Sequence, residues 1–87
     1  MPFDELDPVY VTRPQEGEDP YAGRHVRVPE GELGTVILVG HGDTCDVEFL
    51  LRHPDGSPYS AVLYVPKDDL IPYEQGKQKY GEPQHAF

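Results

Sequence analysis

The stretch Val26-Arg-Val-Pro-Glu-Gly-Glu-Leu-Gly-Thr-Val-Ile-Leu-Val-Gly40, continued by Asp43-Thr-Cys-Asp-Val-Glu-Phe49, decides the fold. Its β-branched and aliphatic residues come in short runs, and glycines interrupt each run before it is long enough for a helix. The pattern predicts strand, glycine turn, strand, glycine turn and strand. Nothing in the stretch has the composition of an active site, so it predicts an architecture and not a reaction.

Working outward, five strands are expected, and one of them alternates most cleanly. In residues 44–50, Cys45, Val47 and Phe49 share one face, which predicts that they lie in the core and the intervening acids outside. Residues 35–39 are apolar throughout and predict a strand buried on both faces, joined to 44–50 by a glycine-rich hairpin turn. The complete set of expected strands is 24–28, 35–39, 44–50, 59–65 and 71–73, with one helical turn at 66–70.

The N-terminal residues 1–22 are expected to be less regular. They carry four prolines and an acidic cluster, and they predict an extended arm that packs Phe3, Leu6 and Tyr10 on the core. Residues 9–12 are the one β-like run, so an added edge strand stays open, as does a wholly disordered arm.

The C-terminal residues 74–87 have no periodicity and predict a flexible tail, which leaves residues 23–73 as the domain. A chain of 87 residues makes one domain and buries only roughly 60% of the surface its unfolded form exposes. Ten prolines and nine glycines favour many turns and few helices, hence an all-β class. The single Cys45 permits no internal disulfide, and the N-terminus lacks the features of a secretory signal, so a cytoplasmic location is expected.

The net charge of -9 limits the kinds of partner. Nucleic-acid affinity depends on Lys and Arg that displace counterions, and anionic membranes attract basic segments, so the charge argues against both. No run approaches the ~20 apolar residues of a membrane span. The first 22 residues carry six acids and one base, Arg13, which predicts either a solubilising surface or a surface for a basic protein partner.

Three segments resemble the sequence pattern of small SH3-like barrels. Gly31-Glu-Leu-Gly-Thr-Val36 is similar to the Gly-x-x-Gly-x-Val turn after the first strand of these barrels, including the KOW-type ones. Asp46-Val-Glu-Phe49 resembles the strand that follows, and Val65-Pro-Lys-Asp-Asp-Leu-Ile-Pro72 resembles the closing helical turn and last strand. Over residues 23–73 the chain resembles short bacterial proteins of unknown function that consist of one such barrel.

This resemblance implies an SH3-like barrel of roughly five strands, with one short helical turn before the last strand. Related barrels occur in the variable subunit of ferredoxin-thioredoxin reductase, in a small stromal subunit of photosystem I and in the nitrile hydratase β subunit. There the barrel is an accessory or docking piece and not the catalyst. The resemblance transfers no catalytic residue, and what it implies about function is analogy.

No set of reactive residues predicts catalysis. Cys45 lies on the apolar face of its strand, so it is expected in the core rather than as a nucleophile activated by His41 or His53. A zinc site built from these three residues needs His25 or His85 from far away, and the chain lacks the close Cys and His pairs typical of such sites. We therefore expect no enzyme activity, no metal, no cofactor and no small-molecule substrate.

Recognition of a protein partner is the expected function. Tyrosines are common in interfaces because they present apolar area with a polar tip, although each one here could instead close the barrel. An open barrel edge is also able to accept a partner's strand. The candidate contacts are Tyr59, Tyr64 and Tyr73 on or beside the last strands, with Glu16, Glu18 and Asp19 of the arm.

Three alternatives stay open. One is an antitoxin or immunity-type protein that neutralises a basic partner, and another is an accessory subunit of a metal or redox enzyme. The third is a nucleic-acid-binding KOW-like barrel, which requires a basic patch within a domain that has twice as many acids as bases. The bases that would have to cluster are Arg24, Arg27, Arg52 and Lys67.

Overall fold

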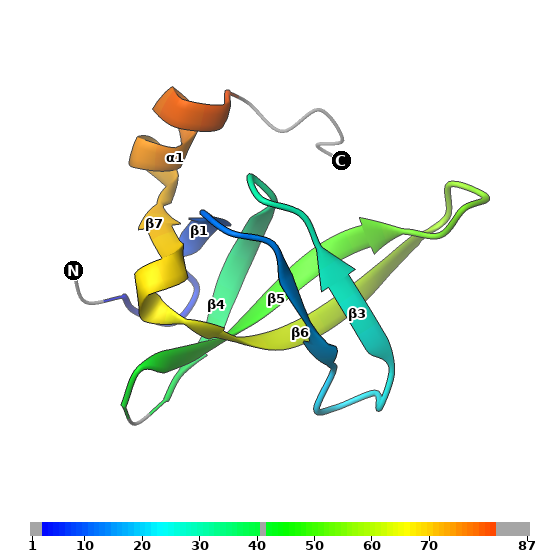
Figure 1. The fold of residues 1–87 in the computed structure, drawn as a ribbon. Helices are drawn as coiled ribbons and strands as arrows, with labels where there is room; N and C mark the ends of the chain where they lie inside the picture. The colour runs from blue at the N-terminus through cyan, green and yellow to red at the C-terminus, as the bar shows by residue number, and fades with distance from the viewer. Residues whose placement is uncertain (1–2, 41, 82–87) are drawn as a thin grey trace.

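The computed structural model describes residues 3–40 and 42–81 and is mostly β, with one α-helix (Figure 1). A five-stranded sheet has the order β6-β5-β4-β1-β7, and a separate two-stranded sheet pairs β2 with β3. These pairings do not close into one continuous barrel. The elements are β1 (Pro8–Val11), β2 (Gln15–Glu18), β3 (His25–Val28), β4 (Leu33–Val39), β5 (Thr44–Arg52), β6 (Pro58–Pro66), the 3₁₀ helix η1 (Lys67–Asp69), β7 (Leu70–Pro72) and α1 (Tyr73–Tyr80).

The centre of the structure is the antiparallel meander of β4, β5 and β6. β5 and β6 pair along their whole length, and their turn contains Gly56 with φ of 90°. The predicted hairpin of β4 and β5 is confirmed, but its register shifts between Val36 and Leu38. This shift leaves Ile37 without a partner in the ladder, which is the geometry of a β-bulge.

The core lies between the inner face of the large sheet and the small sheet, which crosses β5 and β6 (Figure 1). Cys45, Val47 and Phe49 are fully buried there, as their alternation predicts. Gly34 is required in this layer, because a Cβ at that position would lie 2.6 Å from Val47 Cγ1. The other core residues that the small sheet and β1 supply are Val9, Val11, Val26 and Val28.

The N-terminal arm is more integrated than expected. β1 is not an edge strand, because it lies between β4 and β7 and pairs with both. Phe3 and Tyr10 are buried as predicted, but the prediction for Leu6 is wrong, since its side chain is 77% exposed. β2 was not expected at all, and it pairs in register with β3 over four residues.

A helix begins where a flexible tail was expected. The prediction for residues 74–87 is corrected over its first part, because α1 extends to Tyr80, while residues 82–87 lie outside the described residues. The rings of Tyr73 and Tyr80 stack on Tyr10 with centroid distances of 5.9 and 5.8 Å. The helix is therefore held by aromatic contacts to β1 and not by an apolar stripe of its own.

We expect Gly76→Ala to destabilise the protein even though alanine favours helices by about 1 kcal/mol. Gly76 is buried against Tyr10, and an added Cβ would overlap that ring. Overpacking of this kind costs about 1–3 kcal/mol, which urea unfolding measures. Gln78→Ala, at an exposed position of the same helix, is the control and should not lose stability. A gain in stability for Gly76→Ala would mean that α1 does not pack on Tyr10.

Candidate functional site

Three large apolar side chains are exposed around one position of the large sheet, on the face turned away from the core. Leu38 is 46% exposed, Tyr64 is 59% exposed and Tyr21 is 67% exposed. Leu38 pairs in register with Asp46, and Asp46 pairs with Tyr64, so these residues form one row across β4, β5 and β6. We call Leu38, Asp46, Tyr64 and Tyr21 the outer patch.

The β-bulge explains why Leu38 belongs to this patch. Val36 pairs with Val47 and points into the core, and regular alternation would place Leu38 on the same side. The unpaired Ile37 shifts the register by one residue, so Leu38 faces Asp46 on the outer side. The prediction that residues 35–39 are buried on both faces is therefore wrong.

The carboxylate of Asp46 lies in the middle of the outer patch. The residue is only 5% exposed, and the hydroxyl of Tyr21 donates a hydrogen bond to its Oδ2 at 3.0 Å. This bond to Asp46 raises the pKa of Tyr21, and burial and the nearby phenol of Tyr64 act in the same direction. The patch thus combines apolar surface with one negative group that accepts hydrogen bonds.

A shallow groove of about 320 Å³ continues the outer patch along the same face. Its lining is mostly apolar, and Glu48 is its single charged residue. Thr35 and Glu48 pair directly and form the next outward-facing row along β4 and β5 after Leu38 and Asp46. A groove of this size holds a few side chains of a partner. The lining residues are Pro8, Leu33, Gly34, Thr35, Glu48, Leu50 and Ser60.

Asp19 fixes the position of Tyr21. The residue is 3% exposed, and its carboxylate accepts hydrogen bonds from the amides of Tyr21 at 2.8 Å, Ala22 at 3.1 Å and Val62 at 3.0 Å. Burial alone would raise the pKa of Asp19, but these three bonds outweigh it and hold the pKa below its usual value. The carboxylate therefore fastens the turn between β2 and β3 to β6.

The same contact protects an edge of the large sheet. β6 is the outermost strand, and the amide of Val62 points away from β5 and is taken by Asp19. Pro58 and Pro66 end the strand and have no amide hydrogen to offer. Addition of a partner's strand to β6 is thus hindered at Val62 and at both ends of the strand.

The structure does not bring the three predicted tyrosines together. Tyr64 belongs to the outer patch, but Tyr59 lies on the opposite face of β6 and packs against the core. The ring of Tyr59 stacks on His53 at 4.3 Å, and the guanidinium of Arg24 lies 4.9 Å above it. Tyr73 is half-buried at the start of α1.

The three predicted acids also differ in their surroundings. Glu16 contacts His25 Nε2 at 2.7 Å and Arg27 at 3.2 Å, and the hydrogen bonds to His25 and Arg27 lower its pKa. Glu18 is exposed at the end of β2, whereas Asp19 is buried and bound to backbone amides. Asp19 therefore has a structural position, and the acids do not share one surface.

Cys45 is in the core, where burial raises the pKa of its thiol. A protonated thiol is a poor nucleophile, so its surroundings do not activate it. Within the described residues there is no group of three or more His, Cys, Asp and Glu side chains arranged to hold a metal ion. His41 and His85, two of the histidines considered as zinc ligands, lie outside the described residues.

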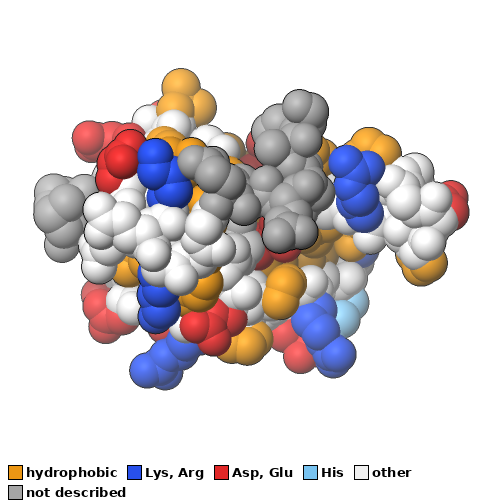
Figure 2. Space-filling view, turned by 90° about the horizontal axis from the view of Figure 1, so that it is seen from above, with side chains coloured by type: hydrophobic (Ala, Val, Ile, Leu, Met, Phe, Trp, Pro, Cys, Tyr) orange, Lys and Arg blue, Asp and Glu red, His pale blue; other side chains and the backbone are white. Residues whose placement is uncertain are grey.

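Three arginines of the domain have different partners within the protein. Arg27 pairs with Glu16, Arg24 lies over Tyr59, and Arg52 donates to the carbonyl of Gly56 at 2.8 Å. On the face shown in Figure 2, Lys and Arg side chains are separated by acidic and neutral ones. The described residues of this face form no coherent basic patch of the kind that nucleic acids require.

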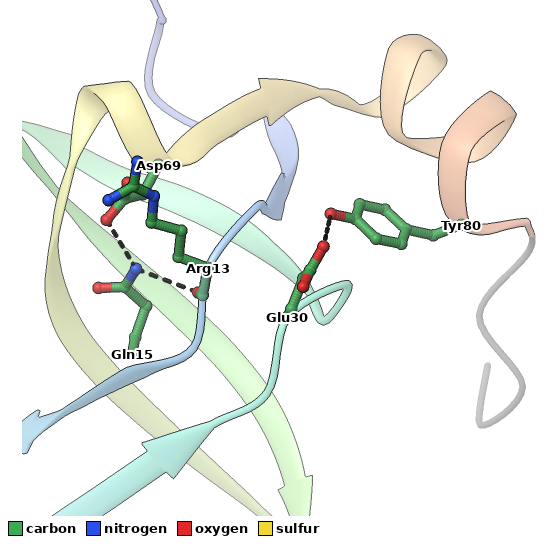
Figure 3. Close-up of polar contacts among 5 residues, drawn as sticks. All are labelled: Arg13, Gln15, Glu30, Asp69 and Tyr80. Atoms are coloured by element: carbon green, nitrogen blue, oxygen red, sulfur yellow. Dashed lines mark hydrogen bonds and ion pairs between the residues drawn. The ribbon is translucent and has the colours of Figure 1, made fainter.

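Three further polar contacts attach the arm and α1 to the rest of the chain (Figure 3). Gln15 donates to Asp69 Oδ2 at 3.0 Å, and Arg13 Nε lies 3.6 Å from Asp69 Oδ1, which joins the arm to η1. The hydroxyl of Tyr80 donates to Glu30 at 2.8 Å and joins α1 to the turn before β4. The polar residues in these contacts therefore have a structural role, because they hold separate segments of the chain together.

Comparison with known proteins gives no relative, since no protein-family model, curated protein or solved structure matches the chain. The described part of the chain contains no helix long and apolar enough to cross a membrane.

We expect Asp19→Asn to lower the free energy of unfolding by about 2 kcal/mol at pH 7, because buried backbone donors lose their charged acceptor. The folded pKa of Asp19 is lowered, so its contribution is complete above the unfolded pKa of about 4 and is lost as the pH falls through the folded value. Urea unfolding should show a gap between wild type and variant that narrows below pH 4. The control Asp68→Asn removes an exposed carboxylate. A gap that is the same at pH 7 and pH 3 would contradict this role.

Proposed function

We propose that the chain is an SH3-like barrel protein that acts as a non-catalytic interaction module and binds a protein partner through the outer patch and its groove. The observation that carries this proposal is the exposure of Leu38, Tyr64 and Tyr21 around one position of a sheet face. Contiguous apolar surface of this kind marks interaction sites, whereas single exposed apolar residues need no explanation. Tyrosine is also enriched at the centre of interfaces.

The SH3-like assignment is supported by three features of the fold. Two sheets pack around one small core, the predicted helical turn η1 is present, and it leads directly into the last strand β7. In addition, Gly34 of the resembling motif is required by its close packing on Val47 and Phe49. In barrels of this type with an accessory role, the fold supplies a rigid face for docking.

The surface chemistry favours a partner segment that is basic and extended. The chain has a net charge of -9, the groove has Glu48 as its single charged residue, and the patch surrounds Asp46. Complementary charge speeds association and rejects acidic partners. A segment with one or two apolar side chains between Lys or Arg residues would match both properties. The lone reduced cysteine is consistent with a cytoplasmic setting for this interaction.

We expect the double variant Leu38→Ser, Tyr64→Ser to weaken partner binding at least about tenfold, because central apolar contacts carry most of the energy of an interface. Partners would be captured from the native cell, identified by mass spectrometry, purified and titrated against both proteins. Urea unfolding should change little, since both side chains are substantially exposed. Gln78→Ser on α1 is the control. Unchanged affinity of the double variant for the purified partner would rule out the outer patch as the interface.

A further inference from the structure

We infer that the outer patch contains a subsite for one arginine side chain of the bound segment, held by the rings of Tyr21 and Tyr64 against the carboxylate of Asp46. This inference rests on the proposed function, because the same partner supplies the arginine. It assigns a specific chemical group to the centre of the patch, where the proposed function requires only a basic, partly apolar segment.

The first argument is the setting of the Asp46 carboxylate. Leu38 and Tyr64 flank it as direct cross-strand neighbours, and Tyr21 covers it. A carboxylate has about four sites for accepted hydrogen bonds, and the hydroxyl of Tyr21 fills one of them. Apolar neighbours reduce the screening of its charge by water, so a cation at this point gains more than one at an open surface.

The second argument is the two exposed tyrosine rings. Both tyrosines adjoin Asp46, because Tyr64 is its cross-strand partner on β6 and the hydroxyl of Tyr21 bonds to its carboxylate at 3.0 Å. A guanidinium stacks on the faces of such rings while its N–H groups bond to a carboxylate. The protein already contains this type of contact elsewhere, since Arg24 lies 4.9 Å above the ring of Tyr59.

The third argument is that Tyr21 is a replaceable donor. Its backbone is fixed by the bond from its amide to Asp19, while its ring lies in an exposed turn between β2 and β3. The hydroxyl can leave Asp46 by side-chain rotation without unfolding the turn. A guanidinium then replaces a neutral donor by a charged one, which strengthens the hydrogen bond.

Arginine fits this subsite better than lysine. An ammonium group is a compact and strongly hydrated charge, so it loses more hydration when it enters a largely covered site. The planar guanidinium is more weakly hydrated and can use both the rings and the carboxylate at once. The same comparison excludes a neutral side chain of similar shape, which would stack but would not neutralise Asp46.

The direct test is a titration of isotope-labelled protein with three blocked peptides that differ at one central residue, which is arginine, lysine or citrulline. The arginine peptide should produce saturable NMR shifts at Tyr21, Asp46 and Tyr64. Citrulline has nearly the same shape without the charge, and its peptide should bind at least about tenfold more weakly. Equal affinity for arginine and citrulline, or shifts located elsewhere on the protein, would overturn the subsite.

Two variants test the roles of the individual groups. Asp46→Asn should weaken the arginine peptide about tenfold, whereas Asp68→Asn, with the same change of charge on η1, should not. Tyr21→Phe keeps the ring and removes the competing donor, so it should tighten binding about three- to tenfold. The matched control is Tyr80→Phe, which also removes a phenol that donates to a carboxylate, that of Glu30. Weaker or unchanged binding by Tyr21→Phe would contradict the replacement of the Tyr21 hydroxyl by the guanidinium. This measurement remains decisive even if Asp46→Asn does not fold.

The outcomes separate this inference from the proposed function. If the Leu38, Tyr64 double variant loses the purified partner but Asp46→Asn binds it normally, the interface stands and the arginine subsite is wrong. If neither variant affects the partner, both proposals fail. Loss of binding in both, with selectivity for arginine over citrulline in the peptides, supports both.

Discussion

One buried carboxylate ties the two sheets together beside the apolar core. Asp19 binds three backbone amides, two in its own turn and one on β6, and so joins the small sheet to the large one. A two-stranded ribbon is marginal alone, and β2 has no large apolar side chain with which to hold itself on the core. The carboxylate of Asp19, which the sequence predicts at the surface, is therefore buried and holds the two sheets together. It also sets where Tyr21 stands, so the architecture and the candidate site share a single anchor.

Much of the fold was predictable because a period of two carries information on burial. The alternation of Cys45, Val47 and Phe49 identified β5 and its inner face, and the core confirms it. β2 and α1 were not predictable in this way, because their polar sequences contain no apolar period. Each forms through partners distant in the sequence, β2 through pairing with β3 and α1 through the ring of Tyr10. Tertiary contacts of this kind leave no local pattern.

Less of the candidate site was predictable. Tyr64 was predicted from its residue type. Leu38 was expected in the core, because the sequence contains no signal for the bulge at Ile37 that turns Leu38 outward. Asp46 was expected outside, and it is outside the core yet covered by Tyr21, a residue 25 positions earlier in the chain. Tyr59 and Tyr73 were expected to contact a partner, but Tyr59 packs against the core and Tyr73 stacks on Tyr10. Whether these side chains are exposed on the outer face or packed inside depends on the unpaired Ile37 and on segments that are distant in the sequence.

The protected edge of β6 has a consequence for selectivity. Backbone pairing is indifferent to sequence, so a free edge would accept many extended chains in a crowded cell. Here the amide of Val62 is already satisfied, and prolines stand at both ends of the strand. If the outer patch is the interface, side chains of the sheet face would select the partner by its residues and not by its ability to extend the sheet at β6. An edge that is closed in this way limits the unselective attachment of extended chains to β6.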